Sequence, residues 1–271
     1  MKGKKITIIG AGNMGSAITR GLVQNGIISG KNITVTDPSP ERLQEVKKLD
    51  VKISNDNKKS TQRVDIVILA VKPDIVPIVL SEIKESLSKK QLVVSIAAGV
   101  EIKTIKKLIG EKQPIVRVMP NLCATIGMSM SCWVASSEVS KHDRKLIKII
   151  LAGLGREYFI DDEGLLDKIT VISGSGPAYI FYLVELLEIT ARKLGLKNEL
   201  VRILAVQTVI GSAELLKNSK KSAGELRAAV ISKGGVTEAI FAVLEKLKFG
   251  DVFFKAIRAG VKRAKELRLL H

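Results

Sequence analysis

The sequence has few of the residues on which many enzymes rely for catalysis. Among its 271 residues are two histidines, His142 and His271, and two cysteines, Cys123 and Cys132. His142 lies beside Asp143 at the start of a predicted helix, and His271 is the last residue, so we do not expect a histidine proton relay. Two cysteines cannot build a disulfide framework or a four-thiolate zinc site, and no residues have metal-ligand spacing. We therefore expect no metal, and a packing role for both cysteines.

Aromatic residues and long apolar runs are also scarce. Aromatic residues make up 4% of the chain, which leaves few platforms for stacking nucleic-acid bases. The longest apolar runs, such as residues 91–100, are far shorter than a membrane span. The basic start is followed by four apolar residues before Gly10, too few for a secretory signal. We therefore expect a cytoplasmic protein that binds neither nucleic acid nor membranes.

The charge is strongly positive. The chain has 44 Lys and Arg residues against 27 Asp and Glu, a net charge of +17. Basic chains bind nucleic acids, anionic membranes or small anions. Here the lysines are scattered as pairs and never form a run of five, which is typical of a solvated surface. With 46% hydrophobic residues, the composition indicates a globular protein with a lysine-rich exterior.

Short apolar segments alternate with amphipathic segments over the first 160 residues. This alternation predicts βαβ units and a mostly parallel, doubly wound sheet that helices cover on both faces. The expected strands are residues 5–9, 32–36, 65–71, 92–97, 115–119, 133–135 and 157–160. The expected helices are residues 15–25, 41–49, 75–86, 101–108 and 143–151.

The remainder of the chain has helical periodicity and no convincing strand. The expected helices are residues 165–194, 199–216, a short helix opened by the capping-box spacing of residues 222–225, 237–247 and 251–267. The first of these is apolar on nearly all sides around residues 180–189, so we expect it to be buried on most sides. We predict an α/β domain over residues 1–161 and an all-α dimerisation domain over residues 162–271.

The segment Gly10–Gly15 is a complete G-x-G-x-x-G pattern between a predicted strand and a predicted helix. In such a turn Gly10 allows the tight bend, Gly12 lets a pyrophosphate approach the backbone, and Gly15 lets helix and strand pack closely. The helix N-terminus then offers N–H groups to the phosphates. Asp37 ends the second strand, where a carboxylate can hold a ribose diol. The first domain is therefore predicted to be a dinucleotide-binding Rossmann domain.

The sequence leaves the choice between NADH and NADPH open. Asp37 favours NADH, because it can bind a 2′-hydroxyl and repels a 2′-phosphate. Arg42, Lys58 and Lys59 could instead attract that phosphate. Arg42 is equally well explained as part of the solvated face of the second helix.

The scarcity of catalytic side chains favours hydride transfer to a C=N bond. A protonated imine is already an electrophile, so the protein needs only to bind, orient and exclude water. Two glycine-rich stretches in the helical half can supply hydroxyls and backbone amides: residues 173–177 and residues 232–237. The second precedes a predicted helix, and its free N–H groups suit a substrate carboxylate. It is also explained as a simple helix cap and turn.

Six segments, taken in order, resemble the pyrroline-5-carboxylate reductase family over essentially the whole chain. They are Ile9-Gly10-Ala11-Gly12-Asn13-Met14, Leu69-Ala70-Val71-Lys72-Pro73, Ser95-Ile96-Ala97-Ala98-Gly99, Arg117-Val118-Met119-Pro120-Asn121, Ser173-Gly174-Ser175-Gly176-Pro177-Ala178-Tyr179 and residues 232–237. The resemblance implies reduction of 1-pyrroline-5-carboxylate to L-proline, the last step of proline synthesis, with NADPH or NADH. It also implies a homodimer, and in some members a decamer of dimers arranged in a ring.

The resemblance further implies roles for individual residues. Gly12, Asn13 and Met14 would hold the pyrophosphate, and Asn57 would lie near the adenosine ribose. Five residues would line the nicotinamide end: Lys72, Pro73, Ala97, Ala98 and Gly99. Ala70 would also bind the cofactor. The substrate would be held by Ser232, Gly234, Gly235 and Thr237, with the hydroxyl of Thr237 near the imine nitrogen as the catalytic group. These four residues would face the cofactor of the partner subunit.

The chain departs from the family pattern at four places. Lys233 stands where the loop usually has proline, Val236 where it has threonine, and Leu122 and Cys123 where the usual residues are threonine and proline. These changes leave two other functions open: a reductase for a different cyclic imino acid, and an inactive paralogue that binds a nucleotide. A β-hydroxyacid dehydrogenase is disfavoured, because that class places a catalytic lysine on the first long helix of the helical domain. Here the turns after Pro177 carry Tyr179, Tyr182, Glu185 and Glu188, and Lys193 comes too late.

Overall fold

The fold is described from a computed structural model for residue 1 and residues 3–269. Eight strands form one sheet in the order β3-β2-β1-β4-β5-β6-β7-β8. Neighbouring strands are parallel except for β6 and β7, which are antiparallel. The strands are β1 (Ile6–Ile9), β2 (Ile33–Thr36), β3 (Lys52–Ser54), β4 (Ile66–Leu69), β5 (Leu92–Ser95), β6 (Ile115–Met119), β7 (Ser129–Ala135) and β8 (Gly155–Phe159). This arrangement confirms the predicted doubly wound, mostly parallel sheet.

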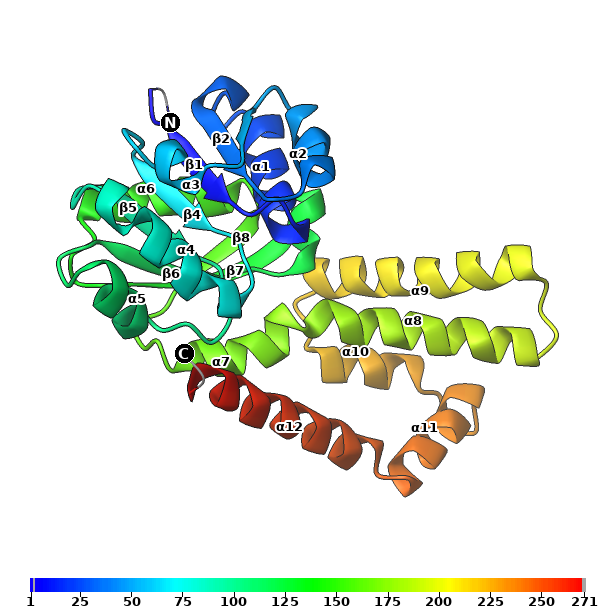
Figure 1. The fold of residues 1–271 in the computed structure, drawn as a ribbon. Coiled ribbons are helices and arrows are strands. Elements are labelled where there is room, and N and C mark those ends of the chain that lie inside the picture. Colours follow the sequence, from blue (N-terminus) through cyan, green and yellow to red (C-terminus); the bar gives the residue numbers. More distant parts are fainter. Residues whose placement is uncertain (2, 270–271) are drawn as a thin grey trace. The chain divides into compact units, whose positions relative to one another are not determined.

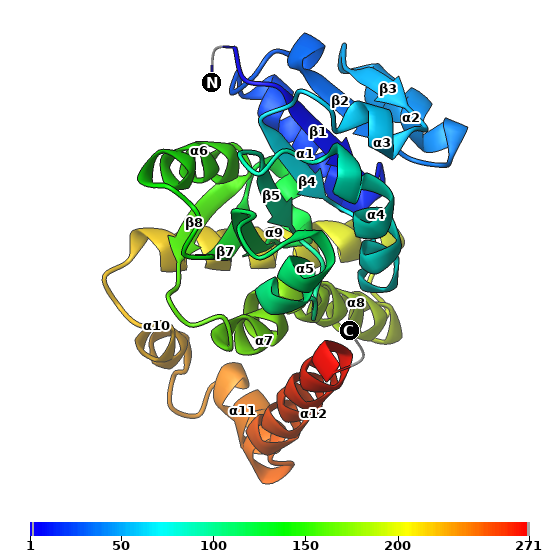
Figure 2. The same ribbon diagram turned by 60° about the vertical axis from the view of Figure 1, so that its left-hand side comes forward.

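Helices cover both faces of this sheet (Figure 1, Figure 2). They are α1 (Asn13–Gln24), α2 (Pro40–Lys47), α3 (Asn57–Ser60), α4 (Val76–Ile83), α5 (Ile102–Ile109) and α6 (Lys141–Ala152). Alternate side chains of each strand point to opposite faces, so the sheet has two apolar cores. Ile6 and Ile8 pack toward α1 and α6 in one core, and Ile9 packs toward α4 and α5 in the other.

Five 3₁₀ or π segments connect these elements. They are η1 (Gly30–Asn32), η2 (Pro73–Ile75), η3 (Lys84–Ser86), η4 (Leu122–Ile126) and the π-helical η5 (Thr170–Gly174). The last of these lies between α7 (Leu165–Ile169) and α8 (Gly176–Lys193), so the single helix expected over residues 165–194 is interrupted. The interruption falls on the glycine-rich stretch, where the backbone widens to a π-turn.

The remaining helices are α9 (Asn198–Asn218), α10 (Ala223–Val230), α11 (Val236–Lys246) and α12 (Phe249–Leu269). The predicted capping box at the start of α10 is present, with Ser222 and Glu225 exchanging hydrogen bonds. In Figure 1, α8 and α9 run side by side as an antiparallel hairpin. The prediction of an all-helical C-terminal part is therefore confirmed.

Packing divides the chain into two compact units. The first, which we call the sheet unit, contains residues 1–177 and 260–271, and the second, the helical unit, contains residues 178–259. The predicted boundary at residue 161 instead separates the α/β part of the sequence from its all-helical part. The difference arises because α7, the start of α8 and the end of α12 pack with the sheet.

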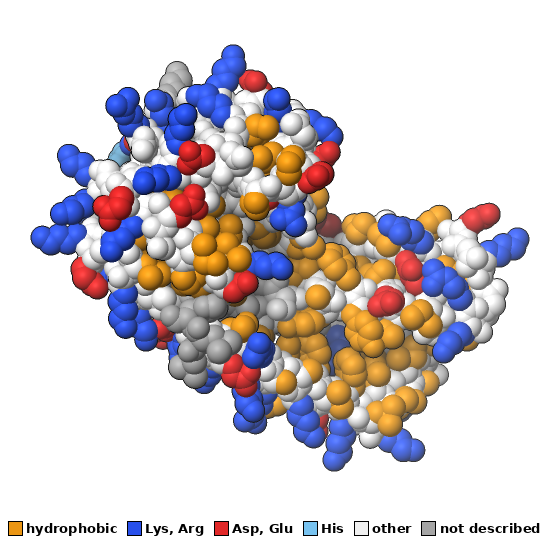
Figure 3. Space-filling model, viewed as in Figure 1, with side chains coloured by type: hydrophobic (Ala, Val, Ile, Leu, Met, Phe, Trp, Pro, Cys, Tyr) orange, Lys and Arg blue, Asp and Glu red, His pale blue; other side chains and the backbone are white. Residues whose placement is uncertain are grey.

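The helical unit exposes most of its apolar side chains. On α8, Phe181 and Tyr182 are 58% and 61% exposed, and no residue of this helix is buried. Burial of α8 on most sides, expected from its composition, is therefore not found within the single chain. Figure 3 shows hydrophobic side chains gathered over this part of the protein. Among the described residues, only the stretch Leu165–Lys193 has the length and apolar character of a membrane-spanning helix.

Candidate active site

The three glycines of the β1–α1 turn differ in how much space surrounds them. A Cβ on Gly10 would lie 2.5 Å from the carbonyl oxygen of Ala70, and one on Gly15 would lie 1.9 Å from the carbonyl oxygen of Gly10. A Cβ on Gly12 would meet no atom within 4 Å. Gly10 and Gly15 are therefore required by packing, whereas Gly12 leaves open space at the N-terminus of α1, where a phosphate can approach.

A cleft of about 1260 Å³ runs along the carboxyl ends of the strands at this turn. It lies where the strand order reverses between β1 and β4, which is the usual ligand site of open α/β sheets. Ten of the predicted cofactor residues line it: Gly10, Gly12, Asn13, Met14, Asp37, Ala70, Lys72, Pro73, Ala97 and Ala98. The cleft is large enough for a dinucleotide.

Asp37 has a structural role that the sequence did not reveal. Its side chain is 4% exposed, and its two carboxylate oxygens accept hydrogen bonds from the N–H groups of Ala11 and Ser39, at 2.8 and 2.9 Å. The carboxylate thus fastens the glycine-rich turn to the end of β2. The guanidinium of Arg42 lies 3.8 Å from the same carboxylate, and its side chain is 62% exposed at the edge of the cleft.

Two predicted cofactor residues do not line the cleft. Asn57 lies behind the end of β2, where its Oδ1 accepts from the hydroxyl of Thr36 and its Nδ2 donates to Glu82. Gly99 is buried with a φ of +78°, and a Cβ there would lie 3.2 Å from the backbone of Leu267 on α12. Both residues therefore hold neighbouring segments in place.

The structure also adds cleft residues that the sequence did not indicate. Leu122 and Thr125 reach the cleft from η4, and Arg20 reaches it from α1. The segment before η4 is held by Asn121, whose side-chain amide donates to the carbonyl of Ser173 at 3.1 Å. The Met-Pro-Asn and Ser-Gly-Ser-Gly motifs thus pack against each other, which a linear pattern cannot show.

The predicted substrate residues lie in the turn between α10 and α11 of the helical unit. Gly234 has a φ of +73°, and its N–H donates to the Glu238 carboxylate at 2.7 Å. A Cβ on Gly235 would lie 2.3 Å from Oγ of Ser232. The turn therefore requires both glycines, and one of its amides already binds a carboxylate oxygen. Thr237 lies in the first turn of α11, where backbone N–H groups have no partner within the helix.

The described histidine and the two cysteines are not among the residues that line the cleft. His142 is exposed near the start of α6, and His271 lies outside the described residues. Cys132 is buried in an apolar cluster, where desolvation raises the pKa of its thiol. Cys123 is half-buried on η4. Within the described part of the chain, no three His, Cys, Asp or Glu side chains are grouped as metal ligands.

A Rossmann sheet with an open glycine-rich turn and a cleft at the carboxyl ends of its strands is typical of a dinucleotide-dependent oxidoreductase. Comparisons with known proteins make this more specific. The family described as "Pyrroline-5-carboxylate reductase dimerisation" matches residues 163–267, and "NADP oxidoreductase coenzyme F420-dependent" matches residues 5–99.

Three relatives match nearly the whole chain. Pyrroline-5-carboxylate reductase 2 of Bacillus subtilis is 36% identical, over 98% of this chain and 95% of its own. The pyrroline-5-carboxylate reductase structure from Coxiella burnetii is 38% identical with a TM-score of 0.87, over 97% and 98% of the two chains. The Plasmodium falciparum pyrroline carboxylate reductase, solved with NADP bound, is 31% identical with a TM-score of 0.91, over 99% of each chain. The chain belongs to the pyrroline-5-carboxylate reductase family.

Proposed function

We propose that the protein reduces 1-pyrroline-5-carboxylate to L-proline with NADPH or NADH as the hydride donor. The observation that carries this proposal is full-length similarity to reductases of this name, in a chain that keeps an open cofactor cleft. The substrate turn also keeps Ser232, Gly234, Gly235 and Thr237. Proline synthesis in the cytoplasm is the setting that fits, and the two free cysteines agree with a reducing compartment.

The cofactor fits the residues that line the cleft. The open space at Gly12 lets a pyrophosphate approach the backbone, and the N-terminus of α1 favours its negative charge. Residues at the end of β2 would hold the adenosine half, and Lys72, Ala97 and Ala98, at the ends of β4 and β5, would hold the nicotinamide half. When bound, the reduced nicotinamide supplies the hydride that forms the new C–H bond at the ring carbon of the C=N bond.

The chain's own residues bind the substrate and handle the proton. The hydroxyl of Ser232 and the amides around Gly234 and Gly235 hold the carboxylate, which takes the place that Glu238 occupies at the Gly234 amide. The hydroxyl oxygen of Thr237 accepts the N–H of the protonated imine, directly or through one water, and so orients the C=N bond whose electrons move onto the nitrogen as the hydride adds to the carbon. Positioning of this kind lowers the activation free energy by about 7–11 kcal/mol.

We further propose that NADPH is preferred over NADH. Both oxygens of Asp37 already accept backbone N–H groups, so this carboxylate is poorly placed to take a ribose diol as well. Arg42 extends an exposed guanidinium beside it at the same end of the cleft. A guanidinium binds phosphate oxygens in a fork, which favours the 2′-phosphate of NADPH.

We propose a homodimer formed through the helical unit, in which the Ser232–Thr237 turn of one subunit completes the cleft of the other. The exposed apolar side chains of α8, α9 and α11 support this, because a single soluble chain rarely exposes so large an apolar surface. The family matched by residues 163–267 is also a dimerisation family. The larger assembly that we propose is a decamer of dimers arranged in a ring. Measurement of the molecular mass in solution would test it.

The direct test is a spectrophotometric assay with purified protein. Pyrroline-5-carboxylate is mixed with NADPH or NADH in parallel, and loss of nicotinamide absorbance is followed. We expect turnover of about 1–10³ per second with a higher kcat/KM for NADPH. Binding of NADPH without turnover would contradict the proposal and favour another cyclic imino acid or an inactive nucleotide-binding paralogue.

The role of Thr237 has its own test in the same assay. Thr237→Ala removes the hydroxyl, and we expect kcat to fall about 100-fold while the Kd for NADPH is unchanged. Thr237→Ser is the matched control, because it keeps the hydroxyl and should retain most activity. Undiminished turnover in Thr237→Ala would remove this residue from the mechanism.

A further inference from the structure

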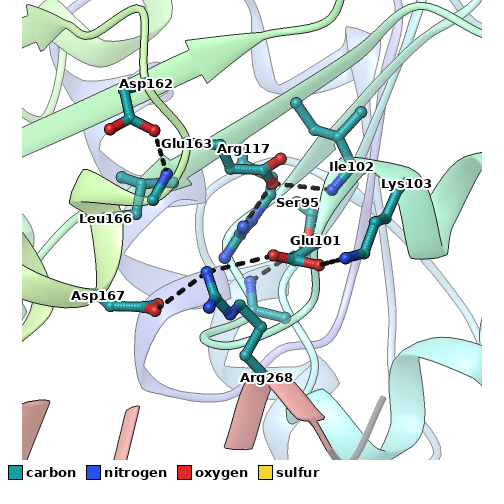
Figure 4. A network of polar contacts seen from close by, with 12 residues as sticks. Ser95, Glu101, Ile102, Lys103, Arg117, Asp162, Glu163, Leu166, Asp167 and Arg268 are labelled. Atoms are coloured by element: carbon teal, nitrogen blue, oxygen red, sulfur yellow. Dashed lines mark hydrogen bonds and ion pairs between the residues drawn. The ribbon is translucent and has the colours of Figure 1, made fainter. Parts of the chain in front are cut away.

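The end of α12 carries a charged cluster within the sheet unit (Figure 4). The guanidinium Nη1 of Arg268 lies 3.4 Å from Oε1 of Glu101 and 3.6 Å from Oδ2 of Asp167. We call these three residues the C-terminal latch. The side chains of Glu101 and Asp167 are 13% and 7% exposed, and that of Arg268 is 31% exposed. Such sheltered charges are costly to leave without a partner.

The latch holds one end of the loop that joins β5 to α5. This loop contains Ala97 and Ala98, which line the cleft, and it ends at Glu101. At Gly99, where φ is +78°, a Cβ would lie 3.2 Å from the backbone carbon of Leu267. The backbone of α12 therefore touches the loop directly, next to the ion pair that Arg268 makes with Glu101.

A second set of contacts fixes both ends of the same loop. The carboxylate of Glu163 accepts the N–H of Ile102 at 2.8 Å and also binds the guanidinium of Arg117, whose side chain is 3% exposed. At the β5 end, Ser95 Oγ accepts the N–H of Ala97 at 3.3 Å. The loop is thus fastened to the sheet at both ends, and the latch adds the contact with α12.

The chain passes between the two compact units twice, and each of these connections continues into a segment of the sheet unit that carries a latch residue. Asp167 lies on α7, just before the chain enters the helical unit at residue 178, and Arg268 lies after the chain leaves that unit at residue 259. Within the sheet unit, α12 packs closely on η5: a Cβ placed on Gly260 would lie 3.0 Å from the Val171 side chain. The ion pair between Arg268 and Asp167 therefore joins the entering and leaving segments.

We propose that Arg268 is a positioning residue for hydride transfer. Through Glu101 and the contact at Gly99, it holds Ala97 and Ala98 at the nicotinamide end of the cleft. This role rests on the proposed reductase function, and a displacement of about 1 Å at such a site can cost up to about 100-fold in rate.

The test compares Arg268→Gln with Arg268→Lys and with Arg263→Gln. Arg263 is the matched control, because it lies on the same helix and makes an exposed ion pair with Glu266 at 3.0 Å. For each variant we would measure kcat, the Kd for NADPH, and the isotope effect on kcat with NADPH deuterated at the transferred position. Amide hydrogen exchange of residues 97–100 is measured in parallel with NADPH bound.

For Arg268→Gln we expect kcat to fall about tenfold with a larger isotope effect, while the Kd for NADPH changes by less than about twofold. Residues 97–100 should exchange faster. Arg268→Lys should recover most of the activity, and Arg263→Gln should match the unchanged protein. Glu101→Gln should lower kcat in the same direction as Arg268→Gln, and the double variant should lose less than the two losses combined, because both substitutions remove the ion pair between Arg268 and Glu101.

Two results would overturn the proposal. One is a folded Arg268→Gln protein whose kcat, isotope effect and loop exchange are all unchanged. The other is an effect of equal size in Arg263→Gln. If the unchanged protein reduces no pyrroline-5-carboxylate, the proposed function fails separately, and the latch is then judged from hydrogen exchange alone: unaltered exchange at residues 97–100 in Arg268→Gln would rule it out.

Discussion

At the scale of single residues, the glycine-rich turn separates packing from ligand binding. The sequence pattern predicted different roles for its three glycines, and the surroundings of each agree: backbone crowds Gly10 and Gly15, while Gly12 faces open space. The hydrogen bonds of Asp37 were not predictable, because the N–H of Ala11 that it accepts is brought to it by the pairing of β1 with β2. An acidic residue at a strand end indicates a cofactor site, but it does not show which hydrogen bonds the carboxylate oxygens already accept within the protein.

This difference predicts opposite effects of two substitutions in the turn. Gly12→Asp places a good N-cap residue at α1 but puts negative charge where the pyrophosphate binds. We expect an unfolding free energy within about 1 kcal/mol of the unchanged protein and at least a 100-fold weaker affinity for NADPH. Gly15→Ala should lower the unfolding free energy by about 1–3 kcal/mol or more, because its Cβ collides with backbone. Urea unfolding measures the unfolding free energy, and fluorescence titration measures the affinity for NADPH. An unstable Gly12→Asp protein would contradict the conclusion that Gly12 serves ligand binding and not packing.

Arg42 gives a prediction for cofactor choice. Arg42→Ala should reduce kcat/KM for NADPH about tenfold and leave the value for NADH nearly unchanged, since only NADPH carries the 2′-phosphate. Parallel assays with the two cofactors measure the ratio. Lys47, an exposed basic residue at the other end of α2, provides a matched control as Lys47→Ala. Equal losses with both cofactors in Arg42→Ala would show that the residue acts on the turn and not on the phosphate.

At the scale of elements, the sequence predicts those that carry a strong local pattern. Strand β6 has the expected bounds, Ile115–Met119, because its apolar run ends at Pro120. The three-residue strand β3 was missed, since Lys52–Ser54 is half-exposed and has no apolar run. The π-helical form of η5 was not predicted, although the sequence showed that the glycine-rich stretch at its end interrupts the helical pattern. The contact between Gly99 and α12 joins residues far apart in the sequence, and no local signal indicates it.

An ion pair between elements predicts a dependence of stability on pH. Nζ of Lys106 on α5 lies 2.8 Å from Oε2 of Glu138, in the connection between β7 and α6. This ion pair, together with hydrogen bonds from Ser136 and Ser137 and from the backbone of Glu138 and against a smaller opposing effect of burial, lowers the pKa of Glu138 from 4.5 to about 2. A depressed carboxyl pKa adds stability that is present above pH 4.5 and is lost as the pH falls toward 2.

Glu138→Gln should remove this contribution. We expect the variant to be about 1 kcal/mol less stable than the unchanged protein at pH 7. The difference should shrink as the pH falls from 4.5 toward 2. Urea unfolding at pH 7 and at pH 3 measures it, with Glu45→Gln as the control, because Glu45 makes an exposed pair within α2. A difference that stays constant over this range would contradict the role given to the ion pair.

At the scale of the whole molecule, the central feature is the exposed apolar surface of the helical unit. Leu183, Leu186 and Leu187 on α8 are each at least 40% exposed. The composition of α8 indicated that its apolar sides need to be covered, and the helical half was predicted to be a dimerisation domain. The proposed dimer supplies this cover from a second subunit, and the apolar stretch Leu165–Lys193 then faces protein.

A shared active site predicts that two inactive variants restore each other. Gly12→Asp damages the cofactor cleft and Thr237→Ala damages the substrate turn. A mixed dimer would contain one site with both defects and one intact site, if each site takes its turn from the partner. Refolding an equal mixture should give about a quarter of the unchanged activity, because half of the dimers are mixed and each has one of two sites intact. No recovery, with mixed dimers shown by mass, would place both parts of the site in one subunit.

The account as a whole depends on hydride transfer to the imine carbon of pyrroline-5-carboxylate. The most direct measurement uses NADPH carrying deuterium at C4, on each face of the nicotinamide in turn, and follows the product by mass spectrometry and NMR. We predict proline with a single deuterium at the ring carbon of the former C=N bond, from one of the two labelled cofactors only. Oxidation of NADPH without labelled proline, or no reaction while NADPH binds, would contradict the account.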